Sequence, residues 1–148
     1  MDWNHYRFTT VWDLPVGPDT AFTALEHPED YPRWWPQVRA VTRVDDSTAT
    51  ARFRSSLPYS LVVTLHRHRR DPAARILEAA MSGDLDGWAR WTVTPRDGGS
   101  RIVYEQEVDV RTALLRRLAV PGRPVFRANH TLMMRSGRRG LTAWLRTV

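Results

Sequence analysis

The sequence predicts an α+β fold in which a mainly antiparallel sheet of about seven strands packs against one long C-terminal helix. Three observations predict this arrangement. Apolar residues alternate with polar ones over most of residues 37–110, as in strands with one buried face. Short turn signals such as Asp97-Gly98-Gly99 separate these runs. After residue 124 the apolar spacing becomes helical. The length of 148 residues predicts a single domain over residues 1–148.

The first part of the chain is predicted to form one strand and two short helices. Residues 6–14 place Phe8, Trp12 and Leu14 on one side, as a strand does. Two prolines within residues 15–18 end this strand, and residues 19–25 form a short helix. The segment HPEDYPRWWP then holds three prolines. It permits one further helical turn at most, because the residue before a proline is pushed towards extended geometry.

Six more strands are predicted to follow in hairpins, because short turn signals separate runs of alternating residues. The last run alternates most regularly, with Tyr104 and Gln106 facing inward and Glu105 facing outward near Arg90. The predicted strands span residues 37–44, 49–55, 59–69, 75–82, 85–94 and 101–110.

The long C-terminal helix is predicted from a stripe of residues at helical spacing, which we expect to face the sheet. The stripe consists of Phe126, His130, Met133, Gly137, Leu141 and Trp144. Residues 112–118 could start a helix of their own, interrupted by Pro121 and Pro124.

The charge is distributed unevenly along the chain. Residues 111–148 contain nine arginines and no acidic residue, whereas residues 1–110 contain 13 arginines and 16 acidic residues. A basic C-terminal third could attract nucleic acid, an anionic membrane or an acidic partner. The interpretation we favour is a solvated arginine face on one helix, and we do not expect nucleic-acid binding, because the aromatic residues do not lie between the arginines. Peripheral contact with an anionic membrane and the oligomeric state both stay open.

Several classes of chemistry are excluded or disfavoured by residues that the sequence lacks. It contains no cysteine, which excludes disulfides, thiolate metal sites and thiol nucleophiles. It contains no phosphate loop, dinucleotide fingerprint, GxSxG or HExxH motif, so we expect no cofactor. His66 and His68 share a strand face without an obvious third ligand, so we expect no metal site. The sequence has neither a membrane-length apolar run nor a signal-peptide pattern, so we expect a cytoplasmic protein.

Four segments in order resemble one known superfamily. They are DYPRWWPQV (residues 30–38), SGDLDGWARW (82–91), GGSRIVYEQEVDV (98–110) and PVFRANHTLMMRSGRRGL (124–141). Together they resemble the START-like, or SRPBCC, superfamily, and within it the polyketide cyclase/dehydrase-like branch. The resemblance implies a helix-grip fold, in which the curved antiparallel sheet surrounds the long C-terminal helix. It also implies a deep apolar cavity between the sheet and this helix that holds a hydrophobic small molecule. Some members fold a polyketide chain and promote its aldol cyclisation and dehydration, while others only bind or carry a lipid or isoprenoid quinone. Both roles stay open here.

The inward-facing residues of such a cavity are the candidate ligand-binding residues: Trp35, Phe53, Leu61, Trp91, Gln106, Asn129 and Met133. The alternative is that they simply form the core, which is least satisfactory for Gln106, because a buried amide needs partners. His130, Tyr59 and Tyr104 are the candidate catalytic residues. Histidine has an unperturbed pKa near 6.5 and can transfer protons, and the tyrosines could donate a hydrogen bond to a carbonyl or enolate. The alternative for His130 is a core histidine bonded to the backbone.

The segment YPRWWPQV is predicted to close one end of the cavity. Adjacent side chains cannot point the same way, so we expect Trp35 to pack near the cavity and Trp34 to be partly exposed. In the segment GDLDG, we expect Gly87 to leave room under the helix.

Overall fold

A computed structural model describes residues 5–54, 60–111 and 122–146. It has the predicted helix-grip fold, with seven antiparallel strands, short helices after the first strand and one long C-terminal helix. The strands are β1 (His5–Leu14), β2 (Val38–Arg43), β3 (Thr48–Arg54), β4 (Ser60–Asp71), β5 (Ile76–Gly83), β6 (Leu85–Arg96) and β7 (Gly99–Val110). The helices are α1 (Pro18–Leu25), the 3-10 turn η1 (Pro28–Asp30), α2 (Tyr31–Trp34) and α4 (Gly122–Arg146).

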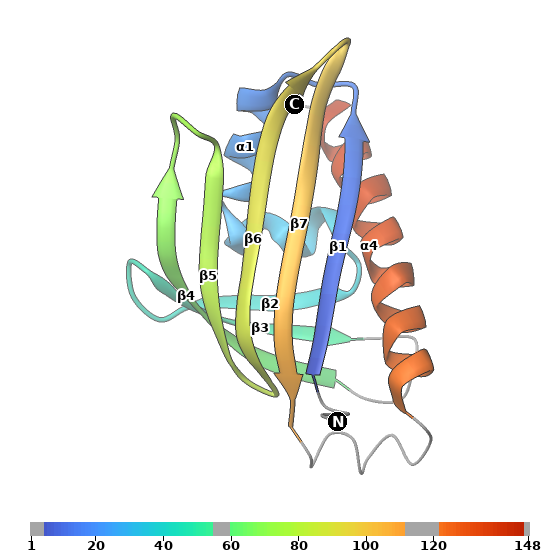
Figure 1. Cartoon of the computed structure of the whole chain (residues 1–148). Helices are drawn as coiled ribbons and strands as arrows, with labels where there is room; N and C mark the ends of the chain where they lie inside the picture. The colour runs from blue at the N-terminus through green and yellow to red at the C-terminus, as the bar shows by residue number, and fades with distance from the viewer. Residues whose placement is uncertain (1–4, 55–59, 112–121, 147–148) are drawn as a thin grey trace.

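The sheet has the strand order β1-β7-β6-β5-β4-β3-β2. The first strand therefore pairs with the last, with His5 opposite Asp109 and Leu14 opposite Ser100. The sheet curls so strongly that β2 and β3 run across the direction of β6 and β7, and α4 runs alongside β1 (Figure 1). This curl gives the sheet a concave face that α4 and the short helices cover.

Strand β7 confirms the predicted alternation and positions the polar residues of the interior. Ile102, Gln106 and Val108 are buried on the concave side. On the other side, Arg90 binds Glu78 at 2.6 Å and lies 3.6 Å from Glu105. The expected contact between Arg90 and an acidic residue of β7 is thus present.

The tryptophan pair is packed differently from our expectation. Trp34 and Trp35 are both only 4% exposed, so the prediction that Trp34 is partly exposed is wrong. The reason lies in α4, where two glycines let the segment approach the helix backbone. A Cβ atom on Gly140 would lie 1.6 Å from the Trp34 carbonyl oxygen, and one on Gly137 would lie 2.6 Å from the Trp35 ring. The Trp34 ring also stacks on Trp35, with centroids 5.4 Å apart.

The role expected for Gly87 is also wrong. A Cβ atom there would lie 2.0 Å from the carbonyl oxygen of Glu107, so this glycine makes room for strand β7 and not for the helix. Tyr59 and the helix that residues 112–118 could start lie outside the described residues. Among the residues that the structure describes, no helix is long and apolar enough to cross a membrane.

Candidate functional site: a cavity between the sheet and helix α4

A cavity of about 200 Å³ lies between the concave face of the sheet and helix α4. Its walls are mainly apolar and come from β2 to β7, α4 and the segment around Tyr31. Leu61 and Leu65 line it from β4, and Leu77 and Met81 line it from β5. An apolar enclosure with a few polar groups is the usual form of a small-molecule site.

Aromatic rings form one end of the cavity. The Trp35 ring lies 5.7 Å from Trp12 and 6.3 Å from Trp91, measured between centroids. Its indole nitrogen donates a hydrogen bond to the Met133 carbonyl oxygen at 2.9 Å. This bond attaches the segment before β2 to the middle of α4. The Tyr31 hydroxyl donates to the Leu25 carbonyl oxygen and so holds the phenol at the same end.

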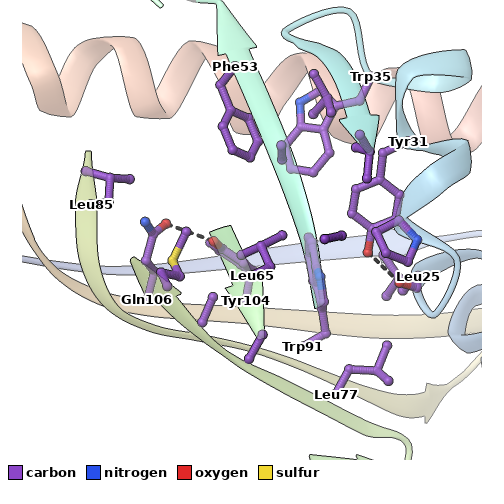
Figure 2. Close-up of a pocket in the computed structure, with 18 of the residues that line it drawn as sticks. Leu25, Tyr31, Trp35, Phe53, Leu65, Leu77, Leu85, Trp91, Tyr104 and Gln106 are labelled. Atoms are coloured by element: carbon purple, nitrogen blue, oxygen red, sulfur yellow. Dashed lines mark hydrogen bonds between the residues drawn. The ribbon is translucent and has the colours of Figure 1, made fainter. Parts of the chain in front are cut away.

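Three polar side chains meet farther along the cavity. The Tyr104 hydroxyl donates a hydrogen bond to Oε1 of Gln106 at 2.8 Å, which Figure 2 shows as a dashed line. Nε2 of His130 lies 3.2 Å from the same oxygen. The His130 ring stacks on Phe8, with centroids 3.8 Å apart and the planes 10° apart. Gln106 is only 4% exposed, and its buried amide oxygen has hydrogen-bonding neighbours from both β7 and α4.

Burial favours the uncharged forms of the titratable side chains in this cluster. Burial lowers the pKa of His130 to about 4, and the charge of Arg127 acts in the same direction. Burial raises the pKa of the Tyr104 phenol well above its ordinary value, and burial likewise raises that of Tyr31. At neutral pH the imidazole is therefore neutral and both phenols keep their protons. The cluster can donate and accept hydrogen bonds, but it holds no charge of its own.

Charged residues also line the cavity, among them Glu26, Arg43, Asp46 and Arg67, and the last three of these are exposed to solvent. Two of them are in ion pairs that connect the helical segment to the sheet. Glu26 binds Arg70 at 2.8 Å, and Arg43 binds Glu29 at 3.1 Å. The cavity is thus apolar inside and charged at its rim.

A surface groove lies on the other side of the cavity wall. It is lined by Pro36, Gln37, Asn129, Leu132, Met133, Ser136, Arg139 and Gly140. Asn129 and Met133 also line the cavity, so the groove and the cavity adjoin at these two residues. Leu132 is 52% exposed on this face of α4.

The structure brings nearly all of the candidate residues to this cavity. Its lining includes Trp35, Phe53, Leu61, Trp91, Tyr104, Gln106, Asn129, His130 and Met133. Tyr59 is outside the described residues. Sequence reasoning missed Tyr31, Leu65, Leu77, Met81, Leu85 and Phe126. Phe126 is on the predicted helix stripe. Leu65 lies four residues after the candidate Leu61 in the strand predicted over residues 59–69, and hence on the same face. Both residues therefore had a signal that could have identified them.

No metal centre is found in the part of the chain that the structure describes, where no three His, Cys, Asp or Glu side chains could together hold an ion. The rings of His66 and His68 are 6.0 Å apart. Nδ1 of His66 is hydrogen-bonded to the Thr48 hydroxyl at 2.9 Å.

A comparison with protein-family models relates this architecture to known proteins. Residues 5–143 match the family described as "Polyketide cyclase / dehydrase and lipid transport". The chain belongs to this family. Membership confirms the resemblance to the START-like superfamily and supports a role in binding a hydrophobic ligand. No curated protein matches the chain.

Solved structures share the fold at low sequence identity. The Zhui aromatase/cyclase from Streptomyces sp. R1128 is 13% identical with a TM-score of 0.78, over 96% of this chain and 94% of that one. A START superfamily protein from Mycobacterium smegmatis is 16% identical with a TM-score of 0.73, over 95% and 97% of the two chains. The di-domain ARO/CYC StfQ from the steffimycin biosynthetic pathway is 15% identical with a TM-score of 0.67, over 93% of this chain and 51% of that one. At these identities the likeness concerns the fold.

Proposed function

We propose that this protein binds a hydrophobic, polyketide-like small molecule in the cavity between the sheet and α4, and that it promotes cyclisation of that molecule mainly by holding it folded. The observation that carries the proposal is the composition of the cavity. Apolar side chains and aromatic rings surround it, and a cluster of three uncharged polar side chains interrupts the apolar wall.

The size of the cavity sets the scale of the ligand. Its volume of about 200 Å³ exceeds that of an apolar cavity of about 150 Å³, which admits benzene. A one- or two-ring compound is therefore the class of ligand that matches this volume. A longer chain would have to extend through the rim past Arg43 and Arg67 or displace side chains.

The chemistry of the polar cluster favours positioning over strong acid–base catalysis. The low pKa of His130 makes it a weak base, and the raised pKa of Tyr104 makes it a weak acid. Holding two reactive carbons of one chain close together can alone contribute several kcal/mol, about 7 or more in favourable cases. A cyclase of this kind would use His130 and Tyr104 to orient a carbonyl and to move a proton during enolisation.

The quenching of tryptophan fluorescence by a bound probe tests the binding. Trp35 and Trp91 line the cavity, so titration with 2-acetonaphthone, a two-ring ketone, is expected to change their emission and to saturate. The matched variants are Leu61→Trp, which narrows the cavity, and Val62→Trp, which adds the same ring at a neighbouring position that is 46% exposed. Weaker binding in Leu61→Trp but not in Val62→Trp would support binding in the cavity. Equal binding in the two variants would contradict it.

A second candidate function is non-catalytic transport of a lipid or isoprenoid quinone, which the surface groove favours. The groove shares Asn129 and Met133 with the cavity, and Leu132 is exposed beside it. Arg135, Arg139 and Arg146 are exposed on α4. An anionic membrane would attract such a face and could deliver an apolar ligand next to the cavity wall.

Sedimentation with vesicles tests this second candidate. The protein should bind vesicles of phosphatidylcholine with phosphatidylglycerol but not vesicles of phosphatidylcholine alone. R135Q/R139Q/R146Q should weaken this binding about a hundredfold, at about 1 kcal/mol per arginine. The control R7Q/R52Q/R54Q removes the same charge from exposed strand positions. Equal loss in both triple variants would indicate attraction by net charge alone and would contradict docking through α4.

A further inference from the structure

The oxygen of Gln106 has two polar neighbours, the Tyr104 hydroxyl and the His130 ring. Oε1 accepts the hydroxyl proton of Tyr104 at 2.8 Å and lies 3.2 Å from Nε2 of His130. An amide oxygen can only accept hydrogen bonds. The His130 contact is therefore a hydrogen bond only if Nε2 carries the proton, which leaves Nδ1 as an acceptor.

The ring of His130 has little freedom to turn away from this arrangement. It stacks on Phe8 of β1 at 3.8 Å and lies 6.3 Å from the Tyr104 ring of β7 with the planes 24° apart. The stacking fixes the plane of the imidazole, and the bond to Gln106 fixes which nitrogen points to β7.

The same arrangement also determines the surroundings of the Gln106 amide nitrogen. Within the described part of the chain, no group accepts a hydrogen bond from it, because both bonds of this side chain go to Oε1. Figure 2 shows this nitrogen on the side of the amide that faces away from Tyr104. Gln106 lines the cavity, and an amide donor that a bound ligand cuts off from water costs free energy unless the ligand supplies an acceptor.

We propose that Gln106 holds His130 as its Nε2–H tautomer and, with its own amide nitrogen, selects ligands that bring a carbonyl oxygen into this part of the cavity. This inference rests on the proposed binding function and adds the chemical class of the ligand, an apolar ring compound with a ketone, ester or quinone-type carbonyl. Gln106 is a positioning residue for His130 and a binding residue for the carbonyl. The neutral state of His130 that burial imposes agrees with this arrangement.

The tautomer is tested by NMR on the full chain labelled with ¹⁵N-histidine. The signals of His130 are identified by their loss in His130→Gln. The Nε2–H proton of His130 is expected to be visible and protected from exchange with water, and Gln106→Met, which keeps the side-chain length but removes the oxygen, should abolish this protection. Gln37→Met is the matched control, since Gln37 lies at the surface groove, and it should leave the proton unchanged. A proton on Nδ1 in the wild type, or unchanged protection in Gln106→Met, would overturn the assignment.

The ligand class is tested with two probes of the same ring system. Wild-type protein should bind 2-acetonaphthone about fivefold more tightly than 2-ethylnaphthalene, the effect of one ordinary hydrogen bond. Gln106→Met should lose this preference, and Gln37→Met should keep it. Equal affinity for both probes in the wild type would refute carbonyl selection and leave cavity binding intact. Absence of binding for both probes would refute carbonyl selection together with the proposed function, and the NMR result would still judge the tautomer.

Discussion

Replacing Gly137 with alanine should separate the Trp35 ring from helix α4 and destabilise the protein. The new Cβ atom would lie 2.6 Å from Cε2, 2.8 Å from Nε1 and 2.9 Å from Cζ2 of Trp35. A Cβ atom essentially never lies this close to an atom to which it is not bonded, so the Trp35 ring has to move. Trp35 is only 4% exposed and hydrogen-bonded to the Met133 carbonyl oxygen, so a shift affects both its packing and its bond.

Two destabilising effects and one stabilising effect determine the expected change in the free energy of unfolding. Overpacking a well-filled region costs about 1 to 3 kcal/mol. A buried donor that loses its partner costs about 1 to 3 kcal/mol. Alanine stabilises a helix interior by about 1 kcal/mol relative to glycine. The net expectation for Gly137→Ala is a loss of about 3 kcal/mol, which lowers the Tm of a domain of this size by about 9 °C.

Urea denaturation and thermal melts of four proteins form the assay: wild type, Gly137→Ala, Trp35→Phe and the double variant. Phenylalanine is smaller than tryptophan and lacks the indole N–H and Cζ2 of Trp35, so Gly137→Ala should cost clearly less in the Trp35→Phe background. Ser136→Ala, at the neighbouring helix position, controls for helix propensity. The reasoning is refuted if Gly137→Ala is as stable as the wild type, or if it costs the same in both backgrounds.

Three further predictions concern the cavity and the titratable residues. The pKa of His130 in the folded protein is lowered from 6.5 to about 4, so the free energy of unfolding should fall by on the order of 3 kcal/mol as pH drops through that interval. Urea denaturation of His130→Gln should lack this loss, and a pH dependence equal to that of the wild type would contradict the assignment. Asp109 and Glu107 raise the pKa of His5 by their hydrogen bonds, so the contribution of His5 to stability has the opposite pH dependence. It is present at low pH and is lost as pH rises through the raised pKa, and His5→Gln should remove this loss of stability. Ala79→Leu fills part of the cavity and should weaken binding of 2-acetonaphthone about tenfold or more without lowering the Tm. Fluorescence titration measures the affinity and thermal melting measures the Tm; an unchanged affinity would mean that the probe binds outside the cavity.

Residues whose neighbours are set by local periodicity could be predicted from the sequence. The alternation in residues 101–110 predicted that Tyr104 and Gln106 face inward, and the structure places both in the cavity lining. The helical spacing after residue 124 likewise predicted that His130 and Met133 face the sheet. Period two and period 3.6 determine which face of an element a residue occupies, and the fold follows from those faces.

Contacts between distant segments could not be predicted in the same way. The burial of Trp34 depends on Gly140, and the Trp35 contact depends on Gly137, both about a hundred residues away in the chain. The meeting of Gln106 with His130 also depends on how far α4 is shifted along the sheet. Periodicity gives the face of each element but not its position along a neighbour, so neither the cavity volume nor the hydrogen-bond pattern followed from the sequence.

Methyl NMR of the protein with ¹³C-methyl methionine tests the central claim of a ligand-binding cavity most directly. Met81 lines the cavity from β5, while Met133 lines both the cavity and the surface groove. With 2-acetonaphthone present, we expect nuclear Overhauser contacts from the probe to the methyl groups of both residues. Contacts to Met133 without Met81, or saturable binding that leaves the Met81 methyl unperturbed, would contradict binding between the sheet and α4.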